Sequence, residues 1–173
     1  SSVEDLRQEN YADLVRSGQS MMWRAGELIH LNSCYAPTVD EELIPEHPIA
    51  AFENGHQHQV PLLIGTNSDE ASFGKFLFQR QSSRERAALR LLASFDPQHA
   101  PEVVAAYDGA VAREDFAHLL ADALFWAPST RIATAHAKVA PTWMYRFDYA
   151  SAVLKWLGLG AMHSMELGNV FGD

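Results

Sequence analysis

The stretch Gly158-Leu-Gly-Ala-Met-His163-Ser-Met-Glu-Leu-Gly-Asn-Val-Phe-Gly172 places a histidine between nearby glycines and a short apolar helix pattern. An earlier stretch, Val60-Pro-Leu-Leu-Ile-Gly65-Thr-Asn-Ser-Asp-Glu70, runs from an apolar strand into a polar turn that carries a carboxylate. An acid after one strand and a histidine after a later strand is the chain order of the second and third members of a catalytic triad. This alternation of strands and helices predicts an α/β fold.

The first member of such a triad, a serine in the frame Gly-x-Ser-x-Gly, is absent from the sequence. Ser20 has Gly18 two positions before it but Met22 two positions after it, and neither Ser72 nor Ser164 has a glycine two positions before it. No His-Gly-Gly run is present to supply the amides of an oxyanion hole. The sequence therefore predicts an acid and a base without their nucleophile.

Three separated segments resemble motifs of the type B carboxylesterase family, which includes cholinesterase-like proteins. They follow the family's order and roughly its spacing from about Pro37 onward. One difference is Ala71, which stands where the family usually has glycine and requires only a negative φ at that turn. The segments are Ala36-Pro-Thr-Val-Asp40 with Leu43-Ile-Pro45 and Pro48, then Val60-Pro61 with Gly65 to Phe73, then Leu157 to His163 with Glu166-Leu and Val170-Phe-Gly172.

This resemblance implies a partial α/β-hydrolase fold, namely the C-terminal part of its mostly parallel sheet with the accompanying helices. Residues 1–173 would form one incomplete portion that lacks the nucleophile-bearing N-terminal part. The implied activity of the complete parent is hydrolysis of carboxylic esters by a Ser-His-Glu mechanism, with Glu70 as acid and His163 as base. No cofactor is implied, and the chain alone is expected to be inactive.

The chemistry of these two residues supports the same roles. Histidine is the side chain whose unperturbed pKa lies near neutrality, as a general base requires, and a carboxylate can fix its tautomer. Asp69 competes with Glu70 as the acid, but the resemblance favours Glu70, and Asp69 is expected to bond local backbone amides. The alternative for His163 is a polar residue that caps the following helix.

Composition excludes several classes of function. Lys and Arg total 13 against 22 Asp and Glu, and a net charge of −9 disfavours binding to nucleic acid or to anionic membranes. No run of about 18 apolar residues is present to span a membrane, and residues 1–5 show no signal-peptide pattern. Cys34 is the sole cysteine, so neither an internal disulfide nor a cysteine-rich metal site is expected.

Other candidate residues carry weaker signals. His56 and His58 have an alternate spacing that suits two metal ligands, but they sit in a polar loop without a third ligand nearby. Glu166 either bonds to the histidine loop or is an ordinary helix residue, and the structural interpretation is favoured. Four alternating aromatic residues are interpreted as core, and five further histidines as surface or packing residues: Trp143, Tyr145, Phe147 and Tyr149, and His30, His47, His99, His118 and His136.

The periodicity of apolar residues predicts the elements between these motifs. Ser82-Ser-Arg-Glu85 is a candidate capping box for a helix whose apolar stripe is Ala88, Leu89, Leu92 and Phe95. The remaining elements are an amphipathic helix at the start, a short helix over Met21–Leu28, a strand Val60–Ile64, a helix from Pro101 to near Gly109, a helix from Phe116 that is interrupted at Pro128 and resumes to Val139, and a strand Trp143–Tyr149.

Two functional hypotheses remain at this point. The first is the ester hydrolase, and the second is a catalytically silent cholinesterase-like domain that serves adhesion or partner binding, because a fold alone does not prove activity. Retention of both Glu70 and His163 favours the enzyme. Because the implied sheet lacks its other strands, the chain is also expected to self-associate or to pair with the missing N-terminal part.

Overall fold

The computed structural model describes residues 2–22 and 37–172, which belong to two compact units, Ser1–Thr38 and Val39–Asp173. In the first unit, the expected helix at the start is two helices, α1 (Val3–Gln8) and α2 (Tyr11–Met22). Ser2 and Asp5 form a reciprocal capping box that begins α1, and the Asn10 side chain accepts a hydrogen bond from the Ala12 amide at the start of α2. The helix expected over Met21–Leu28 lies mostly outside the described residues.

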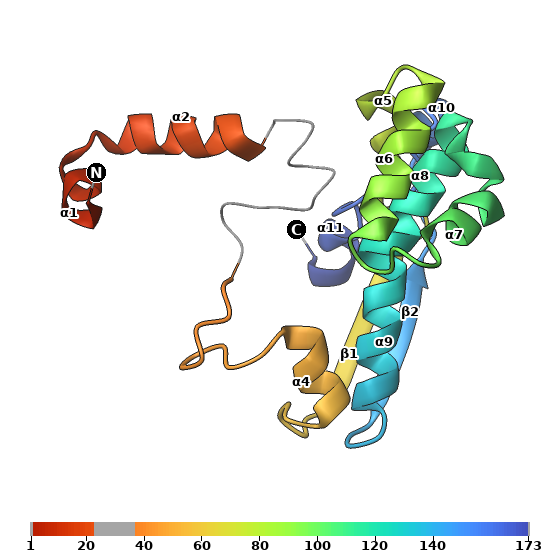
Figure 1. The fold of residues 1–173 in the computed structure, drawn as a ribbon. Helices are drawn as coiled ribbons and strands as arrows, with labels where there is room; N and C mark the ends of the chain where they lie inside the picture. The colour runs from red at the N-terminus through yellow and green to blue at the C-terminus, as the bar shows by residue number, and fades with distance from the viewer. Residues whose placement is uncertain (1, 23–36, 173) are drawn as a thin grey trace. The chain divides into compact units, whose positions relative to one another are not determined.

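The second unit contains a two-stranded parallel sheet of β1 (Leu62–Asn67) and β2 (Thr142–Phe147), drawn yellow and blue in Figure 1. The register pairs Leu62 with Thr142 and Asn67 with Phe147. The parallel α/β arrangement expected from the sequence is therefore confirmed. The first strand begins two residues later than expected, because Pro61 has no N–H to donate, and it continues three residues further through its pairing with β2.

Helices fill the connection between the two strands. Helix α9 lies against both β1 and β2, while α5, α6 and η1 pack against α8, whose Phe116 and Leu119 are the largest fully buried side chains. The connecting elements are α5 (Gly74–Leu77), α6 (Gln81–Ala93), α7 (Ala100–Ala106), η1 (Asp108–Ala110), α8 (Arg113–Ala121), η2 (Asp122–Trp126) and α9 (Ala127–His136). A further helix, α4 (Pro48–Asn54), precedes β1 and packs on α9.

The expected capping box of α6 is wrong, and of the four residues expected in its apolar stripe only Ala88 is buried. The helix begins at Gln81 after Arg80, so both ends of the box lie inside the helix, and Phe95 lies beyond its end with 62% of its surface exposed. The buried face consists of Ala87, Ala88 and Leu91 together with Arg84. The Arg84 guanidinium donates to the carbonyl oxygens of Phe78 and Val111 at 3.0 Å each. These bonds satisfy a buried charge, which hydrophobic patterning cannot anticipate.

The interruption expected at Pro128 takes the form of a π-helical turn. Residues of η2 lie between α8 and α9, and the amide of Ala127 donates to the carbonyl of Asp122, five residues earlier. A proline has no N–H and clashes with the carbonyl four residues before it, so a wider turn just ahead of Pro128 relieves both problems. Helices α8, η2 and α9 therefore follow one another without a break, and Phe125 and Trp126 belong to η2.

One face of the sheet is largely uncovered. Leu63 and Trp143 are register partners and so share a face, and they are 68% and 58% exposed. The aromatic residues of β2 are therefore not core residues in this chain, contrary to the expectation, and Tyr149 lies outside the strand. On the same face the Tyr145 ring covers Gly65, where an added Cβ would lie 2.2 Å from it, so only glycine fits there.

Candidate catalytic site

Glu70 follows the carboxyl end of β1, where the strand turns towards α5. Its side chain is buried, with 8% of its surface exposed. One carboxylate oxygen, Oε1, accepts a hydrogen bond of 2.8 Å from the backbone N–H of Asn67. The last residues of the strand thus hold the carboxylate in one orientation.

His163 lies in the loop between α10 (Ala152–Trp156) and α11 (Leu167–Phe171). Its Nδ1 is 2.8 Å from the second Glu70 oxygen, Oε2, which is a hydrogen-bond distance. Its backbone N–H also donates to the carbonyl of Glu70 at 3.3 Å. The helix that follows begins after Glu166 without a side-chain cap, so His163 does not act as its cap.

The bond to Glu70 assigns the tautomer of the imidazole. An ionised carboxylate can only accept hydrogen bonds, so the proton of the neutral ring is on Nδ1 and the lone pair is on Nε2. The His163 side chain is 54% exposed, whereas its carboxylate partner is buried. The ring of Phe125, from η2, lies 4.9 Å from the imidazole centroid at an interplanar angle of 42°. The imidazole is therefore held on one side and accessible on another.

Asp69 connects the turn after β1 to the histidine loop rather than bonding local amides as expected. Its Oδ2 accepts hydrogen bonds from the backbone N–H of Ala161 at 3.0 Å and from the Ser68 hydroxyl at 2.7 Å. Its own backbone N–H donates to the Ala161 carbonyl at 3.1 Å. Gly160, with φ of +60°, lies so close that an added Cβ would be 2.2 Å from this carboxylate. Asp69 therefore does not replace Glu70 as the partner of His163.

Sequence reasoning assigned no role to Asn67 or Phe125. Asn67 is 5% exposed, and its side-chain amide donates to the carbonyl of Met162 at 2.9 Å and to the Glu166 carboxylate at 2.5 Å. Glu166 is thus hydrogen-bonded to Asn67, the last residue of β1. The asparagine of the Gly65-to-Phe73 motif is the signal that could have marked Asn67, whereas no motif marks Phe125.

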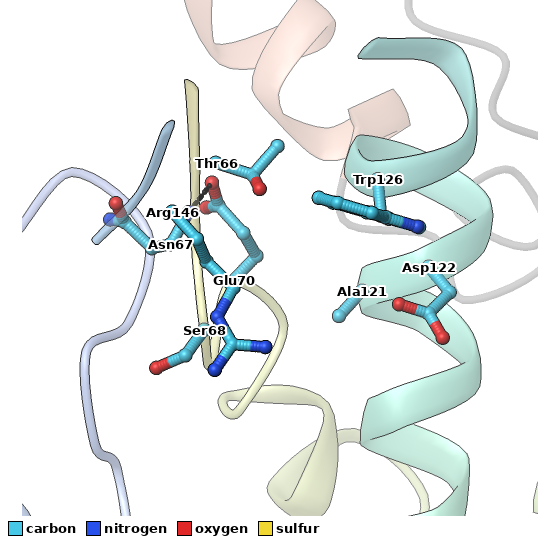
Figure 2. A pocket seen from close by; sticks show the side chains of 8 residues that line it. All are labelled: Thr66, Asn67, Ser68, Glu70, Ala121, Asp122, Trp126 and Arg146. Carbon is cyan, nitrogen blue, oxygen red and sulfur yellow. Dashed lines mark hydrogen bonds between the residues drawn. The ribbon is translucent and has the colours of Figure 1, made fainter. Parts of the chain in front are cut away.

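A pocket of about 200 Å³ lies beside Glu70. Figure 2 shows side chains from the end of β1 facing those of Asp122 and Trp126 across it. Asp122 also accepts a hydrogen bond from the Tyr107 hydroxyl, and burial together with this carboxylate raises the pKa of Tyr107 to about 12. The pocket is smaller than the roughly 300 Å³ at which small-molecule sites begin.

Two of the other candidate histidines have structural partners. His56 pairs with Glu46 and lowers the pKa of that carboxyl, and the buried His136 lies 2.7 Å from the Val60 carbonyl. Over residues 2–22 and 37–172, no group of three His, Cys, Asp or Glu residues could hold a metal ion. No helix among the described residues is long and apolar enough to cross a membrane. His30 and Cys34 lie outside the described residues.

Comparison with known proteins shows the family of this chain. The model of the carboxylesterase family matches residues 1–173, and the chain belongs to this family. The chain is 34% identical to para-nitrobenzyl esterase of Bacillus subtilis (strain 168), over 99% of the chain and 34% of that protein. It is 26% identical to pyrethroid hydrolase Ces2a of Mus musculus, over 85% of the chain and 30% of that protein.

Solved structures show the same relationship. A PNB esterase superimposes with a TM-score of 0.72 at 28% identity, covering 98% of this chain and 35% of that one. A thermophilic PNB esterase gives a TM-score of 0.75 at 29% identity, covering 98% and 34%. The chain therefore has part of the α/β-hydrolase fold, and it spans about a third of the length of the relatives it matches.

Proposed function

We propose that this chain supplies the acid and the base of a serine-dependent carboxylic ester hydrolase, and that the nucleophile lies on another segment of the complete enzyme. The observation that carries the proposal is the 2.8 Å contact between Glu70 Oε2 and His163 Nδ1. Family membership supports the reaction class, and the absence of Gly-x-Ser-x-Gly supports a nucleophile on a different segment from the acid and the base. We further propose that residues 1–173 are one incomplete portion of the hydrolase fold.

The proposed reaction assigns a step to each of these residues. Nε2 of His163 takes the proton of the serine hydroxyl as its oxygen attacks the ester carbonyl carbon, and the imidazolium then protonates the leaving alcohol. Glu70 stabilises the imidazolium through Nδ1–H and keeps the lone pair on Nε2. Water, activated by the same nitrogen, hydrolyses the acyl-serine and releases the acid. No cofactor takes part, because proton transfer and covalent catalysis complete the reaction.

The segment that carries the serine and the oxyanion-hole amides (the serine-bearing segment) is proposed to cover the exposed sheet face. Parallel sheets are covered on both faces in folded proteins, yet Leu63 and Trp143 are mostly exposed here. Each strand of this two-stranded sheet also has one edge that no described strand pairs. An uncovered face and two free edges fit a sheet that continues in the serine-bearing segment.

Reconstitution tests the proposal. With the chain alone, the rate of p-nitrophenyl acetate hydrolysis should not exceed the background rate. When the serine-bearing segment is supplied, the rate should rise above background. Glu70→Ala and His163→Ala should each abolish the restored activity. His99→Ala is the matched control, because His99 is exposed and also pairs with a carboxylate, that of Asp96 at 2.7 Å. Undiminished hydrolysis by the Glu70 and His163 variants would refute the assigned roles.

A further inference from the structure

Asn67 is placed to control both the acid and the loop of the base. Its backbone N–H donates to Glu70 Oε1 at 2.8 Å, while both side-chain donors are directed to the histidine loop. One reaches the carbonyl of Met162, the residue before His163, and the other reaches the carboxylate of Glu166, three residues after it. The buried Asn67 therefore hydrogen-bonds to a residue before His163, to a residue after it, and to Glu70, the partner of His163.

The chemistry of these contacts requires a side-chain amide. Met162 O and Glu166 Oε2 are both acceptors, so the side chain between them must offer two donors at once. A primary amide does so without charge, whereas a carboxylate of the same shape offers none and a hydroxyl offers one. The site is buried, so an unsatisfied acceptor there is costly.

We propose that Asn67 is a positioning residue for catalysis: its side-chain amide fixes the His163 loop while its backbone N–H fixes the Glu70 carboxylate. The inference rests on the proposed function, because its catalytic meaning depends on His163 acting as the base. A loop displaced by about 1 Å moves the imidazole away from both its partner and the serine, and misplacement of this size costs about 100-fold in rate.

Asn67→Asp, made in the complete enzyme, tests the proposal. The substitution keeps the shape and the backbone N–H but removes both side-chain donors and places a carboxylate beside Glu166. Asn169→Asp is the matched control, because it makes the same charge change in the same region at an exposed amide that bonds the Met165 carbonyl at 3.4 Å. Asn67→Ser, which adds no charge, carries the same expectation and is used if Asn67→Asp does not fold.

Two readouts separate positioning from a merely structural role. We expect kcat for p-nitrophenyl acetate to fall about 10- to 100-fold with KM little changed, because both side-chain donors of Asn67 are already bonded to the histidine loop. The double variant Asn67→Asp/Glu166→Gln should recover part of kcat, since the glutamine amide can donate to the new carboxylate. With selective ¹⁵N labelling of histidine, the Nδ1–H form of His163 should lose population in Asn67→Asp and not in Asn169→Asp.

The outcomes distinguish this inference from the proposed function. An active enzyme in which the Asn67 variants keep both kcat and the Nδ1–H form overturns the positioning role and leaves the function standing. An enzyme without esterase activity, in which Asn67→Asp still depletes the Nδ1–H form, overturns the function and supports the positioning contact. Equal losses in Asn67→Asp and Asn169→Asp would show a charge effect and would also overturn the inference.

Discussion

Glu70→Gln changes one atom at the centre of the site. Both carboxylate oxygens of Glu70 accept hydrogen bonds, one from the Asn67 backbone and one from His163 Nδ1, at 2.8 Å each. Glutamine has only one oxygen, and its NH₂ group must face one of these two donors. The backbone N–H cannot change, whereas the imidazole can move its proton. We therefore expect the NH₂ group to face Nδ1 and the ring to carry its proton on Nε2.

That tautomer removes the lone pair that would accept the serine proton. In triad hydrolases the corresponding carboxylate-to-amide change lowers kcat by about 10⁴ while leaving the geometry intact. A factor of this size corresponds to about 5.4 kcal/mol of activation free energy. The free energy of unfolding should fall by far less, about 1.5–3 kcal/mol at most, because one hydrogen bond to a charged group is replaced by a neutral one.

The assay is p-nitrophenyl acetate hydrolysis by the complete enzyme, with the free energy of unfolding measured in urea on the same samples. Glu53→Gln is the control, because Glu53 is an exposed carboxylate that pairs with Arg131 and lies outside the site. Its kcat should equal that of the unmodified enzyme. A Glu70→Gln enzyme that is folded and keeps kcat within tenfold would refute the tautomer argument.

Three further predictions concern the fold around the site. Gly160→Ala should lower the free energy of unfolding more than Gly158→Ala does. Both glycines have positive φ, so an alanine at either position costs about 1–2 kcal/mol, but only the Cβ at position 160 would also meet Asp69. Equal losses in urea unfolding would contradict the contact. The folded-state pKa of Tyr107 lies above its ordinary value of 10.0, so its contribution to stability is full below pH 10 and is lost as pH rises towards 12; Tyr107→Phe should flatten this alkaline decline, and an unchanged pH dependence would count against it. The chain alone should self-associate in light scattering, and Trp143→Lys should reduce this association; a monodisperse monomer of the unmodified chain is the contrary result.

The sequence predicts what local patterns encode. An apolar run that ends in a polar turn predicts β1 and the turn that carries Asp69 and Glu70, and a histidine near glycines predicts the loop of His163. Both segments are short, so each pattern lies within one local stretch of the sequence. The parallel direction of the strands is implied by the family resemblance, and the structure pairs them in parallel with helices in the connection between them.

The contacts that complete the site depend on residues distant in sequence. Asn67 and Glu166 are 99 positions apart, and Asp69 and Ala161 are 92 apart, so no local window contains both partners. The prediction of the buried face of α6 fails for another reason. Ala87, Ala88, Leu91 and Arg84 form that face, while the apolar Leu89 and Phe95 are exposed, so hydrophobicity alone does not select the buried residues.

The central claim is that the acid and the base lie in this chain and the nucleophile lies outside it. The most direct measurement treats the complete enzyme with a serine-directed phosphonate and maps the adduct by peptide mass spectrometry. We predict one adduct, on a serine outside residues 1–173, formed much more slowly in the His163→Ala and Glu70→Gln enzymes. An adduct on a serine within this chain, or labelling at an unchanged rate in both variants, would contradict the claim.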